Sequence, residues 1–482
     1  MKHYIYMHQP FNLDKGGSVG YVSYLYDAYC KHNNNFITND NIKIEFTFPK
    51  ENVKNDILNS VLDKRLLYTQ SYPHAATRHL LTQRQNYFKE IIPSSEENKI
   101  NPNDITSIHI HGAYNFFPIY NSLIKMGVES RVIKMLTTHN PYQPMLEDMY
   151  LTCRTVKWLE HDKQMFKYYL SERDKWAFTL ADCLFFPTEE SMEGYYQSWP
   201  EFRNIIKNKP VYFASTGSEI KTVHKSARIM KEELNIPNDA KVLLYMGRFI
   251  DVRGFDILVQ VAKNILKKYK NIYFIIVGEN IDIPINSNRW IQLPFTNDPG
   301  SFINMADACL CPNRGSLFDL SMIEILSLGK PIICSYVGGY KWLKNKTDGI
   351  IYSEPGNVIS YQNAIEEFLL KSNEQIGHMS RDNFEAYNKL LTLSHFEKGY
   401  SKAVDAMYHE FYNNRQIHKI SYCNMDIAQQ VNFVNINTND KSKINMLNQK
   451  NNIFYKKIKK LIRNPKLFIQ DFMYKRRINN AK

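Results

Sequence analysis

The sequence is poor in the features that mark secreted, disulfide-linked or membrane-spanning proteins. Its 482 residues contain seven cysteines, an odd number with no C-x-x-C pair. Most of them lie in apolar runs, where free cysteine packs as a small hydrophobic residue. The amino-terminal MKHYIYMHQP lacks the apolar core of a signal peptide, and no run of about 18 apolar residues predicts a membrane span. We therefore expect a reduced, cytoplasmic protein without structural zinc.

Most of the chain also has little net charge. The formal charge is +13, but residues 450–482 hold eleven Lys or Arg against one acid, Asp471. This tail therefore carries +10, which leaves +3 for residues 1–449. A nearly neutral body argues against a nucleic-acid-binding protein, and a basic tail favours docking to an anionic surface.

Short apolar runs alternate with longer helical stretches, a pattern typical of an α/β fold with parallel sheets. The expected strands form two series that include HYIYMH (3–8) and KVLLYMG (241–247). The clearest helix, 254–269, places Leu258, Val261, Ala262, Ile265 and Leu266 on one face. We predict two Rossmann-like domains, 1–220 and 221–395, followed by a terminal helix (396–414), a linker (415–450) and a basic amphipathic tail (451–482).

Two groups of residues suggest anion binding at the ends of predicted strands. Gly16 and Gly17 lie between the first strand and a helix that we expect to open at about Val19; an ordinary βα turn is the alternative. Arg248 follows Gly247 at the end of strand 241–247, and Arg253 lies five residues further on. Ligands bind at this edge of open α/β sheets, where two guanidinium groups suit a diphosphate. Solvated surface arginines are the alternative.

The segments MGRFIDVRGFDIL, FIIVGEN and ADACLCPNRGSLFDLSMIEILSLGKPIICSYVGG follow one another over about 110 residues. In order, spacing and type they resemble the donor-binding half of a retaining family 4 glycosyltransferase of GT-B fold. The amino-terminal half resembles this family more faintly, through Gly16-Gly17, the strand before His109 and His111, and Thr138-His139. The resemblance implies two Rossmann-like domains that face a central cleft.

The resemblance also implies roles for individual residues. Arg248 and Arg253 would contact the donor diphosphate, and Glu324 would bind the ribose hydroxyls. Backbone amides near Leu320 and Ser321 would face the phosphates. Gly16 and Gly17 would let their loop approach the donor, and His139 would face the transferred sugar.

Two positions depart from the family pattern. Ser316 stands eight residues before Glu324, where the family has a glutamate that contacts the donor sugar, and Asp319 replaces a glycine. An anion at 319 would repel the diphosphate unless it points away or caps the helix. Both departures put the donor sugar in doubt and leave open a protein that is not itself catalytic.

Simpler structural roles compete for the polar residues. Ser321 to Glu324 fits an S-x-x-E capping box. His109 and His111 face the same side of a strand, where a hydrogen-bonded structural pair is favoured over a metal site. His139 has a core role as its alternative. The chain contains no D-x-D pair, the usual metal-binding motif of glycosyltransferases of the other major fold, so we expect no required metal.

The tail has two apolar stripes beside its basic residues. Phe454, Ile458, Leu461 and Ile462 precede Pro465, and Phe468, Ile469, Phe472 and Met473 follow it. Basic amphipathic helices of this kind bind anionic membranes; docking on the protein's own body is the alternative. The segment IKKLIRNPKLFIQDF also resembles tails of bacterial surface-polysaccharide glycosyltransferases.

These observations predict transfer of a sugar from a nucleoside diphosphate to a hydroxyl of a lipid-linked oligosaccharide or polysaccharide, of capsule or lipopolysaccharide type. We expect the protein on the inner face of the cytoplasmic membrane, with no nucleic-acid partner. A non-catalytic, glycan-binding subunit of another glycosyltransferase is the first alternative. A nucleic-acid-modifying transferase and a GT-B epimerase are the others.

Overall fold

A computed structural model describes residues 1–49, 99–155, 160–278 and 284–413. The predicted linker 415–450 and basic tail 451–482 lie outside these residues. No helix of the described residues is long and apolar enough to cross a bilayer.

The amino-terminal half is built on one parallel sheet of six strands in the order β2-β1-β3-β4-β5-β6. The strands are β1 (Lys2–Tyr6), β2 (Lys43–Thr47), β3 (Ile105–His111), β4 (Ile133–Thr137), β5 (Cys183–Phe186) and β6 (Val211–Phe213). β1 coincides with the predicted strand 3–8 to within two residues. The apolar runs, such as Cys183–Phe186, are buried along their whole length because helices cover both faces of the sheet.

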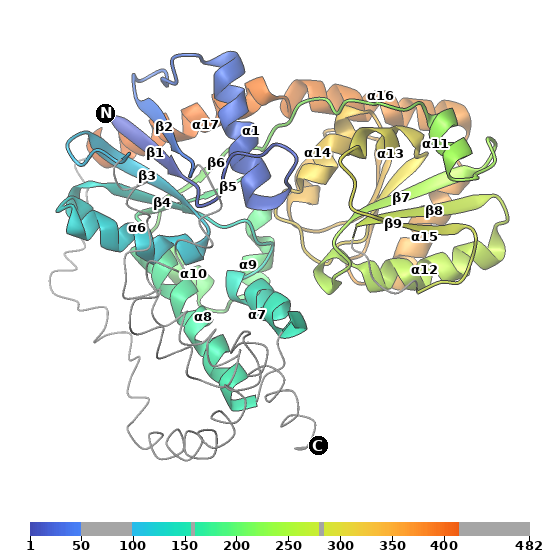
Figure 1. Ribbon diagram of the computed structural model, residues 1–482, viewed down its shortest axis with the longest axis horizontal. Helices are drawn as coiled ribbons and strands as arrows, with labels where there is room; N and C mark the ends of the chain where they lie inside the picture. The colour runs from blue at the N-terminus through green and yellow to red at the C-terminus, as the bar shows by residue number, and fades with distance from the viewer. Residues whose placement is uncertain (50–98, 156–159, 279–283, 414–482) are drawn as a thin grey trace, which may run out of the picture.

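The carboxyl-terminal half repeats this plan with the order β12-β11-β10-β7-β8-β9. Its strands are β7 (Lys241–Gly247), β8 (Ile272–Gly278), β9 (Trp290–Pro294), β10 (Ala308–Cys311), β11 (Ile332–Ser335) and β12 (Ile350–Ser353). The four-residue edge strand β12 was not predicted from the sequence. The two sheets confirm the predicted doubly wound fold of two Rossmann-like domains (Figure 1).

Helices connect the strands in both halves, with several short 3-10 segments between them. In the first half they are α1 (Gly17–His32), α6 (Ala113–Lys125), α7 (Pro144–Thr155), α8 (Glu160–Leu180), α9 (Glu193–Ser198) and α10 (Phe202–Ile206). In the second they are α11 (Ala227–Glu233), α12 (Phe255–Lys268), α13 (Pro299–Met305), α14 (Leu320–Ser327), α15 (Val358–Leu369) and α16 (Asn373–Leu390). The apolar face predicted for helix 254–269 is buried in α12.

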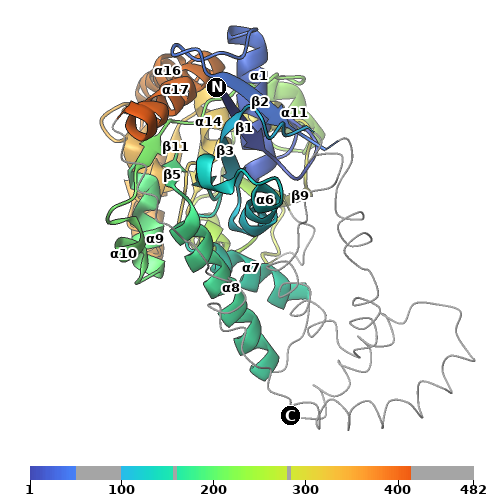
Figure 2. The ribbon, with the colours of Figure 1, turned by 90° about the vertical axis from the view of Figure 1, so that its left-hand side faces the viewer.

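The last described helix, α17 (Leu393–Tyr408), returns to the amino-terminal domain and ends in a short π-helical segment, His409–Asn413. Phe396, Tyr400 and Val404 share a buried cluster with Ile5 of β1 and Val22 of α1. Figure 2 shows α16 and α17 on the same side of the molecule. The predicted terminal helix is therefore an integral part of the first domain.

Within the described residues the chain crosses between the domains twice, and the two crossings are bonded to each other. The first follows β6, and the second joins α16 to α17. Ser218 N donates to Leu391 O at 3.0 Å, and Ser218 pairs with Thr392 in an isolated parallel bridge. The Tyr387 hydroxyl, on α16, donates to Ser218 O at 2.8 Å.

A chain of buried polar groups fixes α17 on the sheet. Thr137 Oγ1 donates to Phe185 O at 2.9 Å, so it accepts from His109 Nε2, 2.7 Å away. His109 Nδ1 must then accept from the Tyr400 hydroxyl at 2.7 Å. The Tyr400 oxygen in turn accepts from His3 Nε2 at 3.0 Å. When donors and acceptors are assigned in this direction, each of these hydrogen bonds joins one donor to one acceptor. Both imidazoles are then neutral.

This burial predicts a steep loss of stability in mild acid. Burial lowers the pKa of His3 to about 3 and those of His109 and His111 well below the usual 6.5. Stability from neutral histidines is complete above pH 6.5 and is lost below it, because the unfolded chain then binds more protons. Each of these histidines should lower the free energy of unfolding by about 1.4 kcal/mol per pH unit below pH ~6. Urea unfolding at pH 7.5, 6.0 and 5.0 measures this loss.

His109→Gln should make the free energy of unfolding depend less steeply on pH, by the equivalent of about one proton. Glutamine can replace both hydrogen bonds of His109 without titrating. His378→Gln is the matched control, since His378 is exposed on α16. An unchanged slope in His109→Gln would contradict the assignment of a neutral His109.

Candidate functional site

The loops that follow the strands of one domain contact the loops that follow the strands of the other. Tyr142, after β4, donates its hydroxyl to Arg314 O, after β10, at 2.6 Å. Ser191, after β5, donates to Leu317 O at 2.5 Å. The carboxyl ends of both parallel sheets therefore face the domain boundary, which is where α/β sheets bind ligands.

Arg253 lies beside the first turn of α14 and is ion-paired with Asp319. The Asp319 carboxylate also accepts from Asn313 Nδ2 at 2.9 Å and from the Tyr340 hydroxyl at 2.6 Å. Asp319 occupies the N-cap position of α14, but its side chain makes no capping hydrogen bond. It neither points away nor caps; instead, it holds the arginine that the sequence assigns to the diphosphate.

Arg248 follows the last residue of β7, Gly247, and pairs with a carboxylate of the other domain. Its Nη1 lies 2.6 Å from Glu147 Oε1, on α7. The two arginines predicted to act together are thus held by different carboxylates. Both remain partly exposed, at 41% for the Arg248 side chain and 29% for that of Arg253.

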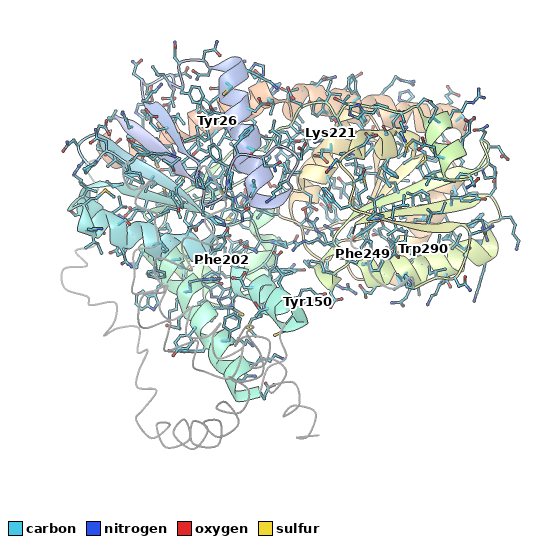
Figure 3. All side chains as sticks on the ribbon, viewed as in Figure 1. Tyr26, Tyr150, Phe202, Lys221, Phe249 and Trp290 are labelled. Atoms are coloured by element: carbon cyan, nitrogen blue, oxygen red, sulfur yellow. The ribbon has the colours of Figure 1, made fainter. Side chains whose placement is uncertain are left out.

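Glu324 points to the domain boundary rather than back along its own helix. Its Oε1 lies 2.9 Å from Lys221 Nζ, and the Tyr24 hydroxyl lies 3.5 Å away. Because α14 begins at Leu320 and the carboxylate engages Lys221, the capping-box interpretation of Ser321 to Glu324 is wrong. Figure 3 shows Lys221 near α14, between the domains.

Lys221 connects three elements through its ammonium group. Besides Glu324 it donates to the Tyr24 hydroxyl of α1 at 2.7 Å. Burial by itself lowers the pKa of Lys221, but the charge of Glu324 and the Tyr24 phenol together raise it above its ordinary value. The lysine is therefore charged throughout the neutral range.

The first turns of α1 and α14 approach each other at this boundary. Gly16 is the N-cap of α1, and Gly17 has a left-handed φ of 66°, which favours glycine. The helix begins at Gly17, two residues before the start predicted at about Val19. A Cβ on Gly20 would meet Leu320 Cδ1 at 2.9 Å. Two positive helix ends, with Leu320 and Ser321 on α14, therefore lie close together.

His139 follows β4 and is stacked on His111, with its Nε2 3.0 Å from His111 Nδ1. Burial lowers the pKa of His139 to about 3, so the ring is neutral. The Tyr21 ring lies 5.0 Å from it, and neither Tyr21 Oη nor His111 Nε2 has a hydrogen-bond partner in the described structure. The rings of His109 and His111 lie on the same face of β3, with their centroids 4.2 Å apart. The described residues hold no cluster of three or more His, Cys, Asp or Glu suited to a metal.

Ser316 lies in the loop between β10 and α14 and is buried. Its Oγ has no hydrogen-bond partner among the described residues, and its carbonyl accepts from Gly339 N at 3.1 Å. The site therefore has a small hydroxyl, and no carboxylate of its own, at this position.

The structure adds residues that sequence reasoning missed: Tyr24, Glu147, Lys221 and Tyr340. Lys221 lies in a polar segment between domains, and Glu147 lies on a helix without a motif. Nothing in the local sequence marks either residue, because their partners are 103 and 101 positions away. Tyr340 does follow the Gly338-Gly339 pair of the motif series, which is the one indication of a site role that the sequence offered.

Comparison with known proteins finds similarity to glycosyltransferases in sequence and in fold. Residues 240–371, in the second half of the chain, match the family described as glycosyl transferases group 1. The O-antigen biosynthesis glycosyltransferase WclY of Escherichia coli is 28% identical over 116 residues, 22% of this chain and 32% of that protein. The alpha-monoglucosyldiacylglycerol synthase of Acholeplasma laidlawii is 23% identical over 228 residues, 44% of this chain and 54% of that protein. The matches thus span about a third to a half of these relatives.

Solved structures resemble almost all of the described fold. Sucrose-phosphate synthase of Thermosynechococcus elongatus gives a TM-score of 0.52 at 14% identity, over 86% of this chain and 99% of that one. Trehalose 6-phosphate synthase of Burkholderia multivorans gives a TM-score of 0.52 at 10% sequence identity, over 85% of this chain and 99% of that one. These likenesses show the fold, which is GT-B.

The contacts of Lys221 predict a stability effect larger than that of a surface ion pair. Lys221→Met should destabilise the protein by about 1–3 kcal/mol, because Glu324 is only 15% exposed and would lose its charged partner. Lys225→Met is the matched control: its partner Glu233 is 49% exposed, so the loss should stay below about 1 kcal/mol. Equal urea midpoints for the two variants would contradict the bridging role of Lys221.

Proposed function

We propose that the protein is a glycosyltransferase that moves a sugar from a nucleoside diphosphate to a hydroxyl of an acceptor, with retention of the anomeric configuration. The group 1 domain and the GT-B fold support a transferase. The observation that carries the proposal is the arrangement of α14: Arg253 lies at its first turn, and Glu324 lies one turn further along. The start of α1 closes the same region from the other domain.

Each group in this region has a role in the proposed reaction. Arg248 and Arg253, with the first turn of α14, stabilise the negative charge that develops on the departing diphosphate. Glu324 accepts hydrogen bonds from the ribose hydroxyls, and His139 faces the sugar from the first domain. Because arginines and helix ends neutralise the diphosphate, we propose that no metal is required.

The acceptor we propose is a lipid-linked oligosaccharide or polysaccharide of capsule or lipopolysaccharide type. One relative is named for O-antigen biosynthesis and another as a glycolipid synthase, so both names point to glycans or lipids. The basic tail, 451–482, would hold the protein at the cytoplasmic face of the membrane, near such an acceptor.

A second candidate, a non-catalytic subunit that binds glycans, is favoured by Ser316 and by the neutralisation of Arg253 by Asp319. Sugar transfer or donor hydrolysis by the purified chain alone would exclude it.

Glu324→Ala should weaken the binding of a nucleotide sugar about 10- to 100-fold, which corresponds to the loss of hydrogen bonds to a charged group. The measurement is thermal stabilisation of the purified protein by UDP-, GDP- and dTDP-sugars, followed by titration with the one that stabilises it. Glu233→Ala, which removes an exposed carboxylate of α11, is the control and should bind normally. Unchanged affinity in Glu324→Ala would refute the ribose assignment.

Deletion of 451–482 should release the protein from anionic vesicles without altering its response to nucleotide sugars. The tail carries ten Lys or Arg, each worth about 1 kcal/mol near an anionic surface. Co-sedimentation with phosphatidylglycerol vesicles checks this, and phosphatidylcholine vesicles serve as the uncharged control. Equal sedimentation of the truncated and full chains would overturn the membrane role.

A further inference from the structure

Two carboxylates of the first domain cross the boundary to cationic partners in the second. Glu147 lies 2.6 Å from Arg248, and Glu193 lies 2.5 Å from Lys341. Glu193 also accepts from Gly338 N at 2.7 Å. The two pairs have similar exposure on the acidic side, 17% for Glu147 and 24% for Glu193. They differ in what they hold, because only Glu147 engages an arginine assigned to the donor diphosphate.

Glu147 is fixed between the two halves of the candidate site. Its Oε2 accepts from Asn140 Nδ2 at 2.7 Å, and Asn140 directly follows His139. Its Oε1 faces Arg248, at the end of β7. The carboxylate therefore stands between Asn140, the residue after His139, and the guanidinium proposed to bind the diphosphate.

Charge and exposure make this pair replaceable. A carboxylate carries one negative charge, whereas a diphosphate offers more charge and several oxygens to a guanidinium fork. The Arg248 side chain is 41% exposed, and ion pairs at such positions contribute little to stability. Glu147 keeps its hydrogen bond from Asn140 when Arg248 leaves, so its carboxylate is not left without a partner.

We propose that Glu147 is a positioning residue that holds Arg248 in the donor-free protein and yields it to the diphosphate of an arriving donor. This inference rests on the proposed function and deepens it. Because Arg248 is already paired with Glu147, the protein binds an anion weakly unless that anion competes successfully with the Glu147 carboxylate. Donor binding then exchanges an interdomain ion pair for a pair with the ligand, and it leaves the Glu147 carboxylate on Asn140.

The experiment compares Glu147→Gln with the wild-type full chain in calorimetric titrations with UDP, GDP and dTDP. Glutamine keeps the shape and the Asn140 hydrogen bond but removes the charge that competes for Arg248. We expect the variant to bind its preferred nucleoside diphosphate about 3- to 10-fold more tightly, because the competitor is weakened. A merely structural role would give equal or weaker binding, so the sign of the change is diagnostic.

Three further proteins complete the test. Glu193→Gln removes the other interdomain carboxylate and should leave the affinity unchanged. Glu147→Asp draws the carboxylate back by one methylene and should also tighten binding. Adding Arg248→Gln to Glu147→Gln should abolish the gain, since no arginine remains to be released.

The outcomes separate the two levels of inference. Binding by the wild type with no gain in Glu147→Gln overturns the role of Glu147 and leaves the proposed function standing. An equal gain in Glu193→Gln also overturns it, because the effect would then come from loosening the boundary in general. If neither the wild type nor Glu147→Gln binds any of the three nucleotides, the proposed function fails and this inference fails with it.

Discussion

The domain boundary depends on one constraint among the described residues: three cations at the candidate donor site each have a carboxylate partner. Lys221 faces Glu324, Arg253 faces Asp319 and Arg248 faces Glu147. Charges that leave water need such partners, since an unpaired charge in a partly buried place is costly. These three cations are therefore neutralised in pairs, and under the proposed function an anionic ligand would bind by exchanging partners with them.

This constraint explains how Asp319 fits a site that resembles a phosphate-binding one. From the sequence, a negative charge at this place argued against a diphosphate. In the structure the charge is spread over hydrogen bonds from Arg253, Asn313 and Tyr340. Asp319 thereby sets the direction of the guanidinium, and this reduces the freedom that Arg253 would lose on binding a ligand.

Much of the fold was predictable because the strands of both sheets are covered on both faces. Continuous apolar runs such as Cys183–Phe186 identify such strands without knowledge of their neighbours. The edge strand β12 was not predicted, although its length equals that of β5. The ion pairs at the boundary were not predictable, since Lys221 and Glu147 find partners about a hundred residues away. Glu324 shows the limit of local reasoning: its spacing from Ser321 fits a cap, yet tertiary contacts draw it to Lys221.

The doubled connection between the domains restricts how they can move. Because Ser218 is bonded to Leu391 and Thr392, the outgoing and returning segments lie against each other rather than at separate points. The two crossings therefore form a single joint, so a rotation of one domain against the other would turn both segments together. Drawing the strand ends of the two sheets apart would break the hydrogen bond from Tyr142 to Arg314.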